Sequence, residues 1–100
     1  MIIKKSLLDG GCKFSLTGKF TFSDHQNFRT VIETIKSDGV EVVELDLGGL
    51  EYLDSAALGM FLVAKQETEK NNCRLYLSNP VGHVKNMFEL SNFNTLFEIR

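Results

Sequence analysis

The chain has 100 residues, of which 43% are hydrophobic and 24% charged, and its formal net charge at pH 7 is -2. This length and composition fit one hydrophobic core, so we expect a single domain over residues 1–100. Basic residues are interspersed with acidic ones, which argues against a nucleic-acid partner. The longest apolar run, AALGMFLVA, is nine residues long, whereas a membrane span needs about 20. We therefore expect a cytoplasmic protein without a membrane partner.

The two cysteines give no indication of a metal or redox site. Cys12 and Cys73 lie far apart in the sequence and belong to no CxxC motif or Cys/His cluster. Free cysteine is among the most buried residue types, so both are expected to be structural thiols. We accordingly expect neither a metal nor a cofactor.

The first half of the chain predicts a hairpin, a helix and a strand. Residues 2–7 and 12–17 are β-prone and are separated by the turn sequence DGG. The sequence SDHQ, residues 23–26, has the spacing of a capping box, and apolar residues follow it at helical spacing as far as Ile35. Asp38-Gly39 is expected to end this helix. Residues 40–47 are then predicted to form a β-branched strand, with Gly48-Gly49 as turn residues.

The second half alternates helix and strand. A helix is expected to begin near Ser55, and residues 74–78 alternate as a strand. Asn79-Pro80 predicts a helix cap with proline at the first helical position, and residues 95–99 are expected to form a last short strand. The order of elements predicts an α/β fold: a mixed β-sheet of four to five strands with about three helices, in a single layered domain.

The junction between strand and helix, LGGLEYLDSAALGM, raises the question of what Ser55 does. In one interpretation Asp54 or Ser55 is simply the N-cap of the helix, worth about 0.5 to 2 kcal/mol. In another, the hydroxyl is a phosphorylation site, since a helix N-terminus tolerates a group of roughly -1.5 to -2 charges. Dipole effects of about 0.3 to 1 kcal/mol would leave the fold nearly unchanged. An interface that covered the same charge would lose about 3 to 5 kcal/mol of binding free energy. Phosphorylation would therefore change binding rather than folding.

Three segments in order resemble one family. The run DLGGLEYLDSAALG resembles the DLSGVxxIDSSGLG-like motif of STAS domains, particularly the single-domain bacterial anti-sigma factor antagonists. LTGKFTFSDHQNFR is similar to the LxGxLD stretch that precedes the first helix of the family. RLYLSNPVGHVKNMFELSNFNTLF is similar to its closing half. The chain departs from the motif at Ala56 and Ala57, which replace the usual second hydroxyl and glycine, so Ser55 is the one hydroxyl left in this loop.

The resemblance implies a phosphorylation-switched binding protein of a partner-switching pathway. Unphosphorylated, it would bind a serine protein kinase that doubles as an anti-sigma-type regulator and so release the regulator's target. Phosphorylation of Ser55 would abolish binding, and a PP2C-type phosphatase would restore it. The kinase would supply nucleotide and Mg²⁺. The partner-binding residues expected from the resemblance and from their place beside the loop are Asp24, His25, Asp54, Ser55, Ala56, Ala57, Leu58, Gly59 and Met60, with residues 56–60 as an exposed run of which Leu58 also contributes to the core.

Other interpretations of these residues stay open. Asp24 and His25 would also be explained as a helix cap and a solvated histidine, and His83 is expected to face solvent without a special role. A constitutive STAS subunit of a larger complex, such as a lipid-transport ATPase or a sensory scaffold, would need no phosphorylation. Catalytic residues are not expected, because the chain lacks GxSxG and an adjacent Asp and Ser do not make a triad. Nothing in the sequence demands more than a monomer.

Overall fold

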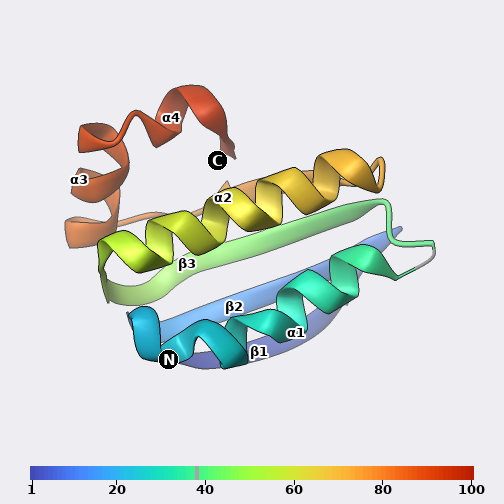
Figure 1. Ribbon diagram of the computed structural model, residues 1–100, viewed down its shortest axis with the longest axis horizontal. Helices are drawn as coiled ribbons and strands as arrows, with labels where there is room; N and C mark the ends of the chain where they lie inside the picture. The colour runs from blue at the N-terminus through green and yellow to red at the C-terminus, as the bar shows by residue number, and fades with distance from the viewer. Residues whose placement is uncertain (38) are drawn as a thin grey trace.

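The fold is a mixed five-stranded sheet covered on one face by helices (Figure 1). It is described by a computed structural model for residues 1–37 and 39–100. The strands lie in the order of the chain: β1 (Ile2–Leu8), β2 (Gly11–Phe20), β3 (Val42–Leu53), β4 (Arg74–Ser78) and β5 (Glu98–Ile99). β1 pairs antiparallel with β2, and the remaining pairs are parallel. The helices are α1 (His25–Lys36), α2 (Ser55–Lys70), α3 (Gly82–Leu90) and α4 (Phe93–Leu96). The predicted α/β class and the mixed sheet are confirmed.

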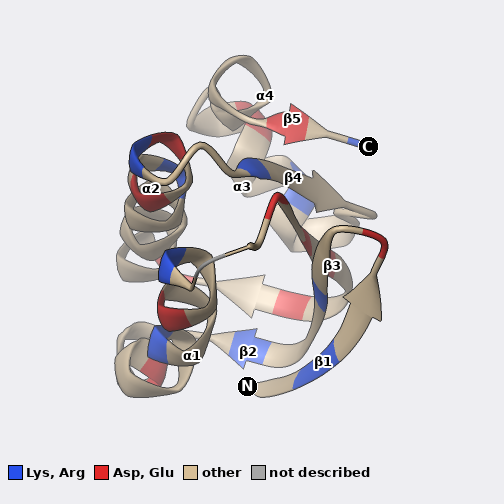
Figure 2. Ribbon diagram, turned by 90° about the vertical axis from the view of Figure 1, so that its right-hand side faces the viewer, with Lys and Arg blue, Asp and Glu red and all other residues tan. Residues whose placement is uncertain are grey.

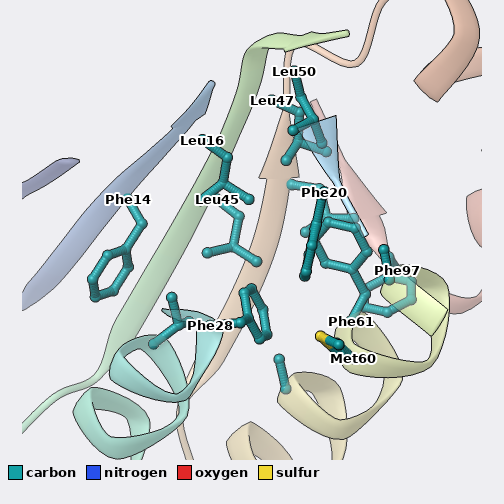
Figure 3. Close-up of a cluster of buried hydrophobic side chains, with 14 of the residues drawn as sticks. Phe14, Leu16, Phe20, Phe28, Leu45, Leu47, Leu50, Met60, Phe61 and Phe97 are labelled. Carbon is teal, nitrogen blue, oxygen red and sulfur yellow. The ribbon is translucent and has the colours of Figure 1, made fainter. Parts of the chain in front are cut away.

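The core lies between the sheet and the pair α1 and α2, which run side by side over it (Figures 1 and 2). Alternate residues of β2 and β3 point toward the helices and are fully buried, among them Phe14 and Leu45. Three phenylalanine rings, those of Phe20, Phe28 and Phe61, meet beneath the two helices with centroids 5.0 to 5.9 Å apart (Figure 3). Burying each such side chain stabilises the fold by about 1.5–3 kcal/mol, so this cluster fixes how α1 and α2 sit on the sheet.

The opposite face of the sheet carries polar side chains that bond to one another. Glu44 accepts hydrogen bonds from the Tyr76 hydroxyl at 2.7 Å and from the Ser78 hydroxyl at 2.6 Å. Glu98 accepts from both Arg74 and Arg100. Because these polar groups form hydrogen bonds with one another, this face of the sheet can stay in contact with water without a covering helix. Among the described residues, no helix is long and apolar enough to cross a membrane.

The predicted hairpin is confirmed, but the expected turn at Gly48-Gly49 is wrong. β3 continues through both glycines to Leu53, and Gly49 pairs with Thr17 of β2. A Cβ atom at Gly49 would lie 2.6 Å from the Thr17 Cγ2, so the close approach of the two strands requires glycine there. The register of β2 against β3 shifts beside this pair, between Ser15 and Thr17. The glycines therefore belong to an irregular strand pair, and β3 is longer than expected.

The start of α1 also differs from the sequence prediction. A single 3₁₀ turn, Phe22–Asp24, precedes α1, and Ser23 does not cap it. The Ser23 hydroxyl instead lies 2.9 Å from the Thr21 hydroxyl, and the Asp24 carboxylate accepts from the Thr21 amide at 3.0 Å. The bond between Thr21 and Asp24 therefore takes the place of the capping box that was predicted to begin at Ser23. α1 ends at Lys36. Of the two residues expected to end it, Gly39 has a positive φ of 85°, and Asp38 lies outside the described residues.

The C-terminal helix boundaries differ too. α3 begins at Gly82, two residues later than predicted, because Asn79 takes a left-handed backbone with φ 57° and bonds to the sheet. Its amide side chain donates to Asp46 at 3.2 Å, and its backbone N–H donates to the Arg100 carbonyl at 3.0 Å. The strand expected over residues 95–99 is reduced to two residues. The preceding segment forms the short helix α4, which places the rings of Phe93 and Phe97 4.9 Å apart in the core.

Candidate functional site

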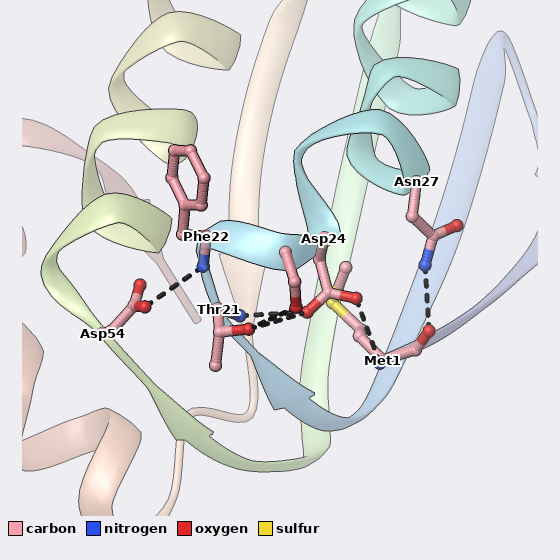
Figure 4. A network of polar contacts seen from close by, with 7 residues as sticks. Met1, Thr21, Phe22, Asp24, Asn27 and Asp54 are labelled. Carbon is pink, nitrogen blue, oxygen red and sulfur yellow. Dashed lines mark hydrogen bonds and ion pairs between the residues drawn. The ribbon is translucent and has the colours of Figure 1, made fainter.

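Asp54 joins the end of β3 to the turn before α1. It is the N-cap of α2, and its Oδ1 accepts a hydrogen bond from the Ala57 amide at 2.9 Å. Its Oδ2 accepts from the Phe22 amide at 3.1 Å (Figure 4). The Asp54 N–H donates to the Phe20 carbonyl at 3.2 Å. Of the two capping residues that the sequence allowed, Asp54 is therefore the cap. The same carboxylate holds two loops together that are 32 residues apart in the chain.

Ser55 is the first residue of α2, and it is exposed. Within residues 1–37 and 39–100, no hydrogen bond engages its hydroxyl, since the capping bond comes from Asp54 instead. The hydroxyl lies at the helix end where backbone N–H groups and the helix dipole favour negative charge. The position can therefore carry a phosphate without breaking an existing contact.

Asp24 supports the turn Phe22–Asp24, which is bonded to the junction of β3 and α2 at residues 53–57, the serine loop. Its Oδ1 lies 3.2 Å from the amino group of Met1, and its Oδ2 accepts from the Thr21 amide (Figure 4). Partial burial alone would raise the pKa of Asp24, but the bonds from the Thr21 amide and the Met1 amino group outweigh it and lower that pKa below its ordinary value. His25, the next residue, is exposed at the start of α1. Asp24 is thus half-buried and engaged within the fold, while the side chain of His25 is exposed to solvent.

A groove of about 490 Å³ runs between α1 and α2. On one side it is lined by the turn before α1 and by α1 itself, and on the other by the first turns of α2. Most of the lining is apolar, and its charged or titratable residues are His25 and Arg29. The lining residues are Phe22, His25, Phe28, Arg29, Ile32, Ala56, Gly59, Met60 and Val63. The structure therefore brings four of the residues expected to contact a partner, His25, Ala56, Gly59 and Met60, to one surface.

The expectation that residues 56–60 form an exposed run is wrong for two of them. Ala57 is 0% exposed and Met60 9%, because the helical period turns these positions toward the sheet. Leu58 is half-buried and packs against the core, as expected, while Gly59 is exposed. Ala57 can thus affect a partner only through the backbone that it helps to fix, whereas Met60 still lines the groove.

His83 has a structural role that the sequence did not indicate. Its Nε2 donates to the Leu53 carbonyl at 3.2 Å, and its ring stacks on Tyr52 with centroids 4.8 Å apart. This contact joins the first turn of α3 to the residue just before Asp54. Sequence reasoning also missed Phe22, Arg29 and Val63, which line the groove. The available signal was weak: an aromatic residue within the polar turn TFSDH, and an arginine four residues after His25.

Comparison with known proteins places this arrangement in a family. The family model described as Mlab, STAS domain matches residues 3–98, and the chain belongs to the STAS domain family. A STAS-domain containing protein of Pseudomonas aeruginosa is 36% identical over 84 residues, which are 84% of this chain and 82% of that protein. An anti-sigma-B factor antagonist of Staphylococcus aureus is 23% identical over 69% of this chain and 64% of its own length.

The fold is similar to that of solved anti-sigma factor antagonists. The unphosphorylated form of SpoIIAA superimposes with a TM-score of 0.83 at 19% identity, covering 99% of this chain and 88% of that one. The phosphorylated form of the same Bacillus protein superimposes with a TM-score of 0.75 at 20% identity, over 99% and 91%. The predicted membership of the STAS family and the resemblance to anti-sigma factor antagonists are therefore confirmed.

Proposed function

We propose that the protein is a regulatory binding protein of a partner-switching pathway, controlled by phosphorylation of Ser55. The unphosphorylated form binds a serine protein kinase that doubles as an anti-sigma-type regulator, and so releases the regulator's target. Phosphorylation of Ser55 abolishes this complex, and a PP2C-type phosphatase restores it. The chain itself contributes a surface and an acceptor hydroxyl, and acts in the cytoplasm by binding.

The observation that carries the proposal concerns Ser55, directly after the capping Asp54: it is exposed, and its hydroxyl makes no hydrogen bond within the described ranges 1–37 and 39–100. The cap already satisfies the Ala57 amide, so the fold does not need the Ser55 hydroxyl for this purpose. Relatives named as anti-sigma factor antagonists and a solved phosphorylated form of a protein with this fold support the same use. Asp24, His25 and residues 54–60 surround or support this position, which is why we propose them as the partner-binding region.

The effect of phosphate on binding follows from its charge. The helix N-terminus favours an anion by about 0.3–1 kcal/mol, so phosphorylation leaves the fold intact. A partner that covered the same group without a cation opposite would lose roughly two to four decades of affinity. The protein can therefore change its binding state without changing its structure.

The proposal is tested on protein purified from its own host, with Ser55→Ala as the control. Intact-mass and phosphopeptide measurements under resting and stressed growth should show a phosphate on Ser55 whose occupancy changes with conditions. The kinase that phosphorylates the purified protein should then bind Ser55→Ala stably and Ser55→Asp weakly. Equal binding of both variants would rule out the switch.

The alternative, a constitutive subunit of a lipid-transport ATPase or sensory scaffold, predicts different results. Ser55 would carry no phosphate under any growth condition, and the protein would co-purify with the larger complex. Replacement of Ser55 by Asp would leave that complex unchanged. The two functions are thus separated by the same pair of variants.

A further inference from the structure

The groove between α1 and α2 exposes apolar side chains that the fold leaves uncovered. Phe22 is 73% exposed and Val63 46% exposed, and they lie on opposite walls of the groove. Among the described residues that line it, His25 and Arg29 are the charged or titratable ones. Neither makes an ion pair or side-chain hydrogen bond with any residue of the described ranges 1–37 and 39–100, and no carboxylate lines the groove. An occupant must therefore offer apolar side chains and negative charge.

Gly59 gives a second, independent indication. A Cβ atom at this position would meet nothing within 4 Å, so the packing of the protein itself does not require glycine. Glycine inside a helix destabilises it relative to alanine. Gly59 lies on the groove together with Ala56, one turn earlier in α2. The absence of side-chain bulk here allows a partner's backbone to approach α2 closely.

The groove suits a helix better than a strand. It is bounded by two helices whose backbone groups bond within each helix, so it presents no row of free N–H and C=O groups for an added strand. The edge strands of the sheet are β1 and β5, whereas α1 and α2, which bound the groove, cover the face of the sheet (Figure 2). Recognition must therefore depend on side chains, and a helix presents them at i, i+3, i+4 and i+7 along one face.

We propose that this groove is the docking site for an amphipathic helix of the partner protein, whose apolar face enters between α1 and α2 and whose Asp or Glu residues face His25 and Arg29. The inference rests on the proposed function, because it assigns the partner's contact with the region beside Ser55. Ser55 directly precedes Ala56 at one end of the groove. A phosphate there repels an acidic helix. Asp54 also fixes the backbone of Phe22 to the serine loop, so one wall of the groove is tied to the modified position.

The occupant is identified by photo-crosslinking in the host. The photoreactive residue benzoylphenylalanine replaces Val63, or Leu62 as the control, which is 37% exposed on the same helix but does not line the groove. Position 63 should crosslink to one peptide with apolar residues at helical spacing and with Asp or Glu beside them. A basic or non-helical peptide, a lipid, or no crosslink beyond that seen at position 62 would overturn the proposal.

Binding of the protein so identified is then measured with matched variants. Gly59→Gln should fill the groove and weaken binding at least about tenfold, while the thermal unfolding midpoint does not fall below that of the wild type. Leu62→Gln is its control. Arg29→Glu should weaken binding by about tenfold. Lys36→Glu, on the same helix, should leave binding unchanged. Replacement of the partner's Asp or Glu that faces Arg29 by Arg should restore the binding of the Arg29→Glu variant. Unchanged binding by Gly59→Gln and Arg29→Glu would refute docking in the groove.

The failures of the two proposals are distinguishable. If Ser55→Asp abolishes binding and the groove variants do not, the phosphorylation switch holds and the partner docks elsewhere. If the groove variants abolish binding and Ser55→Asp does not, the docking site holds and phosphorylation does not control it.

Discussion

At the scale of single residues, Asp54 holds the site together. One carboxylate caps α2 and binds the turn before α1. Asp54→Ala removes both acceptors, so the free energy of unfolding should fall by about 1–2 kcal/mol, measured by urea denaturation. Glu51→Ala, which removes an exposed carboxylate from β3, should stay within about 0.5 kcal/mol of the wild type. Similar losses in both variants would show that the two bonds of Asp54 do not stabilise the loop.

Replacement of Gly59 and of Gly49 by alanine should have opposite effects on the stability of the protein. At Gly59 a methyl group meets open space, so Gly59→Ala should stabilise the protein by about 0.5–1 kcal/mol through higher helix propensity. At Gly49 the same methyl group would lie 2.6 Å from Thr17, so Gly49→Ala should lower the thermal unfolding midpoint. If Gly59→Ala destabilised the fold, an internal packing role for this glycine would replace the one proposed here.

At the scale of elements, the hydrophobic pattern predicted which elements exist better than where they begin. The helical spacing of Phe28 and Val31 and the alternation of β2 identified α1 and the hairpin, because each of these elements buries one face on a single core. Boundaries set by non-local contacts were missed. From the sequence Gly49 was predicted to be a turn residue, but it lies within β3 beside Thr17. Asn79 was predicted to cap α3, but its side chain bonds to Asp46.

The candidate site was predicted in part for the same reason. Ser55 and Asp54 follow a local sequence motif at a strand–helix junction, so the sequence places them correctly at the start of α2. Phe22 and Val63 belong to the site only because α1 and α2 pack side by side, and no pattern within either segment encodes this proximity. The groove is therefore a property of the assembled helices.

The anchoring of α3 through His83 can be tested by hydrogen exchange. His83→Ala removes the bond to the Leu53 carbonyl and the stacking on Tyr52. Amides in the first turn of α3 and in residues 53–57 should exchange severalfold faster, since local opening no longer breaks these contacts. Amides of α1 should be unaffected and serve as the internal control. Unchanged exchange near residue 53 would mean that α3 does not support the serine loop.

At the scale of the whole molecule, stability should decrease in acid. Partial burial alone would raise the pKa of Asp46, but bonds from the Gly48 amide, Asn79 and Lys13 lower it below its ordinary value of 3.8. The unfolded chain therefore takes up this proton at higher pH than the folded protein, so the contribution of Asp46 is present above that value and lost as pH falls below it. Asp24 acts in the same direction.

The contribution of Asp46 is measured from urea midpoints between about pH 7 and pH 3. Asp46→Asn should lower the midpoint at neutral pH and make it fall less steeply toward acid. Asp9→Asn, which changes an exposed carboxylate in the hairpin turn, should retain the slope of the wild type. A slope that is the same in all three proteins would show that Asp46 does not link folding to pH.

The bond between Asp54 and the Phe22 amide also has a consequence for the timing of folding. The serine loop is held by a segment that precedes it by 32 residues, and the two are brought together by the parallel pairing of β2 with β3. Parallel strands can pair only after the crossover between them has been made, and such non-local contacts form slowly. Ser55 is therefore present in the chain before β2 and β3 have paired and the surface around Ser55 has formed. If the proposed function holds, a newly made molecule should bind its partner only after folding, and an unfolded chain should not compete for that partner.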